Sequence, residues 1–193
     1  MQVDKREVER RFRRSMGSYE EHAVVQKRIA ERLAVLAREY VEGTPSRILE
    51  VGCGTGMLTG LMKRQYAEAE LWVNDLVAEL CGRTGERYGI PAGHCLPGDA
   101  EKISFPGTFD LIVSASTFQW FAEPEAMLSK LGNCLRREGV LLFSTFGERN
   151  MQEIRRVTGH GLVYPGLRAM EQLLSRCFEV EYAGEECHVI EFA

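Results

Sequence analysis

Short apolar runs alternate through the middle of the chain with stretches in which apolar residues recur every three or four positions. The runs predict buried strands at residues 47–52, 71–75, 94–97, 109–115 and 139–146. The stretches between them predict helices at residues 56–66, 77–88 and 124–135. Strands that are apolar throughout and separated by helices predict a doubly wound α/β fold, in which helices cover both faces of a mostly parallel sheet.

The two ends of the chain add further elements. Residues 19–40 carry apolar side chains at three- and four-residue steps, which predicts a helix with one buried face. Towards the other end, residues 167–176 predict a helix and residues 178–192 predict one or two strands. We therefore expect a single domain, with a helical extension at 1–42 and the core that carries the sheet at 43–193.

Composition and charge narrow the classes of function. The 193 residues are 45% hydrophobic and 27% charged, and no apolar run approaches the roughly 18 residues of a membrane span. The first 14 residues lack the apolar core of a signal peptide, so we expect a cytoplasmic protein that does not enter a membrane. The net charge of −4 argues against a general nucleic-acid binder, although residues 5–14 hold six basic side chains against two acidic ones. The six cysteines have no zinc-type spacing, so no metal site is expected.

The stretch RILEVGCGTGMLTG, residues 47–60, places a glycine-rich turn between the first predicted strand and its helix. Open parallel sheets bind ligands beyond the carboxyl ends of their strands, and this first turn is the usual place. The dinucleotide fingerprint requires glycine where Met57 stands, which argues against a nicotinamide oxidoreductase. The pattern that is present, E-x-G-x-G-x-G, consists of Glu50, Gly52, Gly54 and Gly56.

This pattern resembles motif I of the class I S-adenosylmethionine-dependent methyltransferases. The resemblance implies that the loop backbone, including Cys53, lies against the methionine and ribose parts of the cofactor. A purely structural turn is the alternative interpretation, because tight turns also use glycine.

Two acidic residues stand where such a cofactor requires them. Asp75 ends the second predicted strand, close to the spacing of about 20 residues at which an acid accepts hydrogen bonds from ribose hydroxyls. Capping of the next helix is the alternative role for Asp75. Asp99 and Ala100 resemble the family motif that binds the adenine edge, and a turn residue is the alternative for Asp99. The resemblance also implies cofactor contacts at Leu76, Ser116 and Gln26.

Further segments make the resemblance more specific. FDLIVSASTFQWF, residues 109–121, matches the family's fourth strand and the turn after it, where the substrate meets the methyl group. Residues 10–26, 118–120 and 144–147 are similar to the malonyl-acyl carrier protein O-methyltransferases of biotin synthesis. This resemblance implies methyl transfer from S-adenosylmethionine to the free carboxyl of a malonyl thioester. S-adenosylhomocysteine is then the cofactor product, and an acyl carrier protein is the partner.

This chemistry needs no general base. A carboxylic acid with a pKa near 4 is already ionised at pH 7, so its oxygen can attack the methyl group without losing a proton. The resemblance assigns positioning roles to Tyr19, in a lid of N-terminal helices, and to Gln119. A packed aromatic is the alternative for Tyr19, and Gln119 bonds either backbone or substrate.

The arginines of residues 10–14 form either a solvated helix face or a landing site for an acidic carrier protein. An arginine or a backbone donor is expected to hold the malonyl carboxylate. The sequence does not identify that donor, and it gives no oligomeric state.

The resemblance breaks at the end of the chain. Members of the family continue with a helical segment and a final antiparallel strand, and no sequence follows residue 193 to form them, so we expect that strand to be missing. Two alternatives to a malonyl methyltransferase stay open. One is another small-molecule methyltransferase with the same cofactor. The other is a truncated chain that binds the cofactor without turnover, as a sensor or partner subunit.

Overall fold

A computed structural model describes residues 4–15, 24–159 and 164–188 of the chain. Residues 2–145 form one compact unit and residues 146–193 form a second. The expected boundary between residues 42 and 43 stays a prediction.

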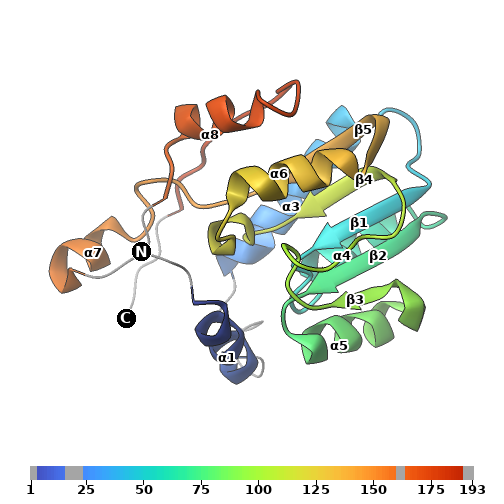
Figure 1. The fold of residues 1–193 in the computed structure, drawn as a ribbon, viewed down its shortest axis with the longest axis horizontal. Helices are drawn as coiled ribbons and strands as arrows, with labels where there is room; N and C mark the ends of the chain where they lie inside the picture. Colours follow the sequence, from blue (N-terminus) through green and yellow to red (C-terminus); the bar gives the residue numbers. More distant parts are fainter. Residues whose placement is uncertain (1–3, 16–23, 160–163, 189–193) are drawn as a thin grey trace. The chain divides into compact units, whose positions relative to one another are not determined.

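The first unit is built on a parallel sheet of five strands in the order β3-β2-β1-β4-β5 (Figure 1). The strands are β1 Arg47–Val51, β2 Glu70–Asp75, β3 Cys95–Pro97, β4 Phe109–Ser114 and β5 Leu135–Phe143. In the central register, Ile48 of β1 lies opposite Leu71 of β2 and Leu111 of β4. The central strands β1, β2 and β4 bury residues on both faces, as their continuous apolar runs predict. The doubly wound, mostly parallel sheet is confirmed.

Helices cover the two faces of the sheet. The helices α3 Val24–Tyr40, α4 Met57–Gln65 and α5 Ala78–Tyr88 contribute to one buried cluster together with Ile48 of β1 and alternate residues of β2 and β4. The helix α6 Pro124–Asn133 lies on the opposite face (Figure 1) and buries Met127, Leu128 and Leu131 completely or nearly so. Alternate residues of a strand point to opposite faces, so each strand contributes to both layers of the core.

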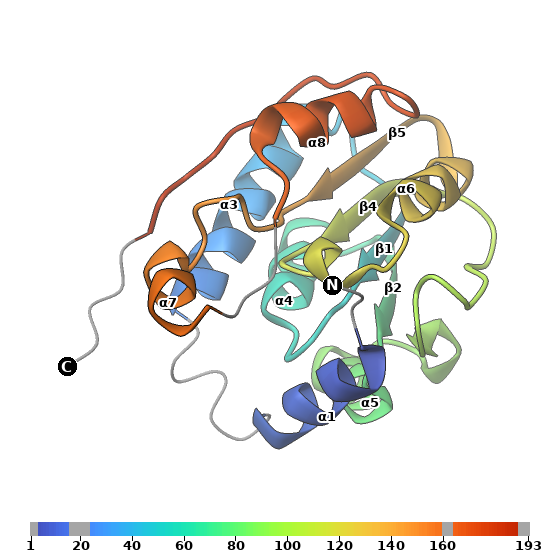
Figure 2. The same cartoon turned by 60° about the vertical axis from the view of Figure 1, so that its left-hand side comes forward.

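The N-terminal helix α1 Lys5–Ser15 belongs to the same unit. It lies beside the start of α5, where Arg13 Nη2 donates to Glu79 Oε2 at 3.0 Å (Figure 2). A helical extension was expected here. Of the predicted helix at 19–40, residues 24–40 are helical and the preceding ones lie outside the described residues.

The predicted start of the last strand, at residue 139, is wrong because β5 begins at Leu135. Its first residues include Arg136, Arg137 and Glu138, which are exposed. Arg136 Nη1 donates to Asp110 Oδ1 at 2.6 Å. Charged side chains at a sheet edge remain in solvent, so they interrupt the apolar run that predicted the strand.

The second unit contains the helices α7 Gln152–Thr158 and α8 Leu167–Leu174. The prediction of strands at 178–192 is wrong for residues 178–188, which form no strand. Phe178, Val180 and Tyr182 alternate with glutamates as in a strand. A strand also needs a hydrogen-bonded neighbour, however, and no described residue pairs with this segment. Among the residues that the structure describes, no helix is both long and apolar enough to cross a membrane.

Candidate functional site

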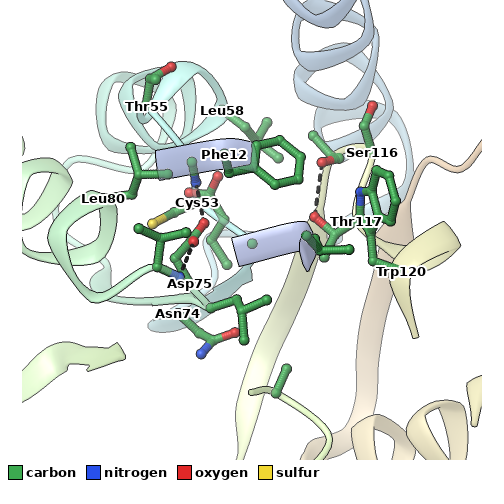
Figure 3. A pocket seen from close by; sticks show the side chains of 18 of the residues that line it. Phe12, Cys53, Thr55, Leu58, Asn74, Asp75, Leu80, Ser116, Thr117 and Trp120 are labelled. Atoms are coloured by element: carbon green, nitrogen blue, oxygen red, sulfur yellow. Dashed lines mark hydrogen bonds between the residues drawn. The ribbon is translucent and has the colours of Figure 1, made fainter. Parts of the chain in front are cut away.

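A pocket of the first unit lies at the carboxyl ends of β1, β2 and β4, and residues of α1 and α3 also line it. Figure 3 shows Asp75 and Cys53 towards one end of it and Ser116, Thr117 and Trp120 towards the other. The predicted cofactor residues that line it are Glu50, Gly52, Cys53, Gly54, Asp75, Leu76, Asp99, Ala100, Ser116 and Gln26. The fold thus brings together residues that are up to 90 positions apart in the sequence, Gln26 and Ser116.

The glycine-rich loop follows β1 with its backbone in the left-handed region. The φ angles are 76° at Gly52, 52° at Gly54 and 86° at Gly56. A Cβ atom at Gly52 would lie 2.1 Å from Thr117 Oγ1, whereas one at Gly54 would meet nothing within 4 Å. Gly52 therefore permits close packing on the turn after β4, and Gly54 leaves bare backbone at the pocket.

Gly56 is the predicted cofactor residue that does not line the pocket. It is the N-cap of α4, and a Cβ atom there would lie 2.5 Å from a ring carbon of Tyr88. The structure therefore gives Gly56 a packing role between α4 and α5.

Asp75 is buried at the end of β2 and binds the backbone of the glycine-rich loop. Its Oδ2 accepts a hydrogen bond from Gly54 N at 2.8 Å, and its Oδ1 accepts one from Val77 N at 2.8 Å. Burial raises the pKa of Asp75, and the two backbone hydrogen bonds oppose that rise. The carboxylate thus joins the glycine-rich loop to the start of α5, and it still has lone pairs for a ligand.

Glu50 lies deeper, with 1% of its surface exposed. Its Oε2 accepts a hydrogen bond from Thr59 Oγ1 at 2.6 Å. Burial raises the pKa of Glu50 to about 8, and the nearby charge of Asp75 adds to the rise. Glu50 is therefore mostly protonated at neutral pH and joins β1 to α4 as a neutral group.

Replacing Glu50 with glutamine should flatten the pH dependence of stability between about pH 4.5 and about pH 8. An unfolded carboxyl ionises near 4.5, whereas the folded one keeps its proton up to about 8, so wild-type stability falls as the pH rises through this window. Glutamine does not titrate, so Glu50→Gln should gain stability relative to the wild type as the pH rises. Denaturant unfolding at several pH values measures this difference, and a constant difference would contradict the burial of an ionisable Glu50.

Asp99 meets the N-terminal helix at the pocket. Lys5 Nζ, on α1, donates to Asp99 Oδ1 and to Glu101 Oε2. Glu101 in turn accepts hydrogen bonds from the backbone N–H of Ala122 at 3.1 Å and of Glu123 at 2.7 Å, just before α6. Burial raises the pKa of Asp99 and of Glu101, but the ion pair with Lys5 and the backbone hydrogen bonds lower both pKa values further than burial raises them. Lys5 therefore ties α1 to the segment predicted to bind adenine.

Removing the ion pairs of Lys5 should lower the free energy of unfolding of the first unit. Lys5→Met leaves two neighbouring carboxylates without their shared cation, and we expect a loss of about 1 kcal/mol in the free energy of unfolding at pH 7. Lys102→Met is the matched control, because Lys102 Nζ lies 3.8 Å from Asp99 Oδ2 but its side chain is 81% exposed. Denaturant titration should show a loss within about 0.5 kcal/mol for the control. Equal losses in the two variants would show that Lys5 is an ordinary surface cation.

The turn after β4 is held by an internal network. Ser116 has a φ of 52°, which is uncommon for a residue other than glycine. Its N–H donates to Ser144 Oγ at 3.0 Å, and its carbonyl accepts from Gln119 Nε2 at 2.6 Å. Gln119 does not line the pocket, so its contacts match the backbone-bonding alternative. Tyr19 lies outside the described residues, and its positioning role stays a prediction.

The sequence pattern assigned no site role to Lys5 and Thr117, and it included Phe12 only within the stretch 10–26 that resembles the family. All three line the pocket, and the Phe12 ring packs edge-on against Trp120 with centroids 5.9 Å apart. A signal for the role of α1 was present in the sequence. Val8 and Phe12 are four positions apart in a short basic helix, so their apolar side chains can share one face that packs on the pocket.

Comparisons with known proteins identify similar sequences and a similar fold. A family model described as a methyltransferase domain matches residues 49–143. A malonyl-acyl carrier protein O-methyltransferase of Bacteroides thetaiotaomicron is 35% identical over 98% of this chain and 73% of its own length. The protein of the same name from Porphyromonas gingivalis is 36% identical over 99% of this chain and 73% of its own length. A solved structure of the plantazolicin methyltransferase BpumL, 18% identical, has a TM-score of 0.67 over 89% of this chain and 74% of its own, which shows a shared fold.

Proposed function

The chain belongs to the family of malonyl-acyl carrier protein O-methyltransferases, and from this premise we propose that it methylates the free carboxylate of malonyl-acyl carrier protein with S-adenosylmethionine. The products are the malonyl methyl ester and S-adenosylhomocysteine, in a step of biotin synthesis. One observation carries the proposal: the predicted cofactor motifs, far apart in sequence, line a single pocket at the carboxyl ends of the strands.

The pocket fits the cofactor. The open space over Gly54 admits a ligand against bare backbone, and Asp75 faces the same pocket for the ribose hydroxyls. Within the described part of the chain, Asp99 Oδ2 has only the distant Lys102 as a cation partner, at 3.8 Å, so it can accept from an adenine amino group while Oδ1 holds Lys5. Ala100 would add its backbone N–H. The other contacts are assigned to Cys53, Leu76 and Gln26 on their place in the lining, and Ser116 lines the end of the pocket next to Thr117.

When bound, S-adenosylmethionine supplies an electrophilic methyl group on a sulfonium. The acceptor carboxylate is already an anion at pH 7. Transfer of that methyl group to a carboxylate oxygen would leave the electron pair on the sulfur and would need no proton transfer, so no residue of this chain has to act as an acid or a base. The residues of this chain therefore bind, orient and exclude water. Tyr19 and Gln119 serve this purpose, Gln119 by holding the Ser116 backbone in place.

The acyl carrier protein would dock at the mouth of the pocket. On α1, Arg10 and Arg11 bond to Glu7, and Arg13 bonds to Glu9 and Glu79. These pairs offset much of the positive charge of the helix, which favours a solvated face over a strong electrostatic landing site. We propose no nucleic-acid partner, and the cytoplasmic location expected from the N-terminal sequence stays a prediction.

An assay with methyl-labelled S-adenosylmethionine tests the proposed function. Label should pass to malonyl-acyl carrier protein in a base-labile ester, faster than to malonyl-coenzyme A or to free dicarboxylic acids. Transfer to another acceptor class with none to malonyl thioesters would make the chain a different small-molecule methyltransferase. Calorimetric binding of the cofactor without product from any malonyl substrate would make it a binding subunit.

A further inference from the structure

Two hydrogen-bond donors at the β4 end of the pocket have no partner among the described residues. Ser116 Oγ and Trp120 Nε1 are buried and make no hydrogen bond with any described residue. Both residues line the pocket, and Figure 3 shows them on the side of Thr117, away from Asp75. An unpaired buried donor costs free energy, so a pocket that keeps two of them is suited to a ligand that accepts hydrogen bonds.

The turn holds both donors in place before any ligand arrives. Ser116 is kept in its left-handed conformation by two hydrogen bonds: its N–H donates to Ser144 Oγ, and its carbonyl accepts from Gln119 Nε2. Trp120 N donates to the Thr117 carbonyl at 2.9 Å, and the indole ring packs against Phe12. Backbone strain that the surroundings maintain in this way is typical of binding and catalytic positions.

Two other side-chain donors of the lining already donate to backbone carbonyls. Thr117 Oγ1 donates to the Ala115 carbonyl at 3.1 Å. Asn74 Nδ2 donates to the carbonyls of Leu96, at 2.7 Å, and Gly98, at 3.0 Å. In the described lining Lys5 is the only cation, and it is held by two carboxylates. An anionic ligand at this end therefore meets neutral donors.

We propose that Ser116 Oγ and Trp120 Nε1 hold one oxygen of the acceptor carboxylate, while its other oxygen attacks the methyl group. This assignment rests on the proposed function, and it names the donors that select a carboxylate. Neutral donors suit the reaction because the carboxylate loses its charge as it becomes an ester. A direct cation would stabilise the ionised substrate more than the transition state and so slow the transfer.

Binding to the enzyme saturated with S-adenosylhomocysteine tests the assignment without turnover. The probes are malonyl-acyl carrier protein and acetyl-acyl carrier protein, which differ by the carboxylate alone. By calorimetry the wild type should prefer the malonyl form, and each of Ser116→Ala and Trp120→Phe should reduce this preference about tenfold. Trp72→Phe is the matched control, because Trp72 Nε1 donates to Glu70 outside the pocket, and it should keep the full preference.

Two comparisons separate this role from a structural one. Ser116→Gly removes the hydroxyl and the backbone strain together, so its malonyl preference should equal that of Ser116→Ala if the hydroxyl is responsible. Affinity for S-adenosylhomocysteine should stay within about twofold of wild type in both variants. The loss of a hydrogen bond to the cofactor would lower this affinity by more than that. A fall in that affinity with the malonyl preference intact would assign Ser116 to the cofactor and overturn the proposal.

The failure of this assignment is distinct from the failure of the proposed function. A wild type that methylates malonyl-acyl carrier protein, with a preference that survives in the Ser116→Ala/Trp120→Phe double variant, overturns the assignment alone. A wild type that neither prefers nor methylates the malonyl form overturns both. Should the double variant not fold, Ser116→Ala decides by itself, because it keeps the Cβ atom and the turn.

Discussion

Gly52→Ala should cost on the order of 3 kcal/mol in the free energy of unfolding and prevent formation of the cofactor pocket. Alanine at a φ of 76° carries backbone strain, and its Cβ would lie 2.1 Å from Oγ1, 2.7 Å from Cγ2 and 2.9 Å from Cβ of Thr117. All three contacts are closer than nonbonded atoms can approach, so either the loop or the turn after β4 must move.

Neither segment can move without breaking hydrogen bonds. Gly52 N donates to the Asn74 carbonyl at 2.8 Å, which fixes the loop to β2. Thr117 is short and β-branched, so no rotation about χ1 removes all three contacts. The carbonyl of Thr117 also accepts from Trp120 N at 2.9 Å in the 3₁₀ turn η2, Phe118–Trp120. The clash therefore disturbs both the glycine-rich loop and the turn after β4, which both line the pocket.

Gly54→Ala shows how much stability is lost through backbone strain alone, without the steric clash that Thr117 causes in Gly52→Ala. Gly54 has a φ of 52°, but a Cβ atom there meets nothing within 4 Å, so this variant should lose only about 1 to 2 kcal/mol. Denaturant unfolding of the two variants measures the difference. The double variant Gly52→Ala/Thr117→Gly should recover the part of the loss that comes from the clash. Equal losses in Gly52→Ala and Gly54→Ala, with no recovery, would show that the approach of Thr117 does not matter.

The sequence predicts the sheet and the cofactor side of the pocket because both depend on local signals. Buried parallel strands appear as continuous apolar runs, and residues that follow such strands meet at one edge of the sheet. Gly52, Asp75 and Asp99 all follow or end strands, so their convergence could be inferred from their order along the chain. The fold class needed no knowledge of side-chain contacts.

The remaining features depend on contacts between distant segments. Lys5 is 94 positions from Asp99, and nothing in the basic run around it distinguishes it from its exposed neighbours. Gln119 is in the predicted turn, yet only the geometry shows that it bonds the Ser116 carbonyl and lies outside the pocket lining. Residues 178–188 have the alternation of a strand, but pairing depends on a partner that the local pattern does not reveal.

Asp75→Ala should weaken binding of S-adenosylmethionine and S-adenosylhomocysteine together, because both carry the same ribose. The loss of charge-assisted hydrogen bonds should cost about 1.5 to 3 kcal/mol, roughly 10- to 150-fold in affinity. The substitution also leaves the N–H groups of Gly54 and Val77 without their acceptor. Part of the effect could therefore come from a loosened loop, and a control must separate the two causes.

Asp110→Ala is that control, because Asp110 makes the same kind of contact away from the pocket. Its Oδ2 accepts from Ser46 N and from Arg47 N, each at 2.8 Å, and it does not line the pocket. Both variants remove a carboxylate that accepts two backbone hydrogen bonds, so both should lose stability, whereas calorimetry with S-adenosylhomocysteine should show a loss of affinity for Asp75→Ala only. If a folded Asp75→Ala variant bound as tightly as Asp110→Ala, Asp75 would serve to join the loop to α5 and would not bind the ribose.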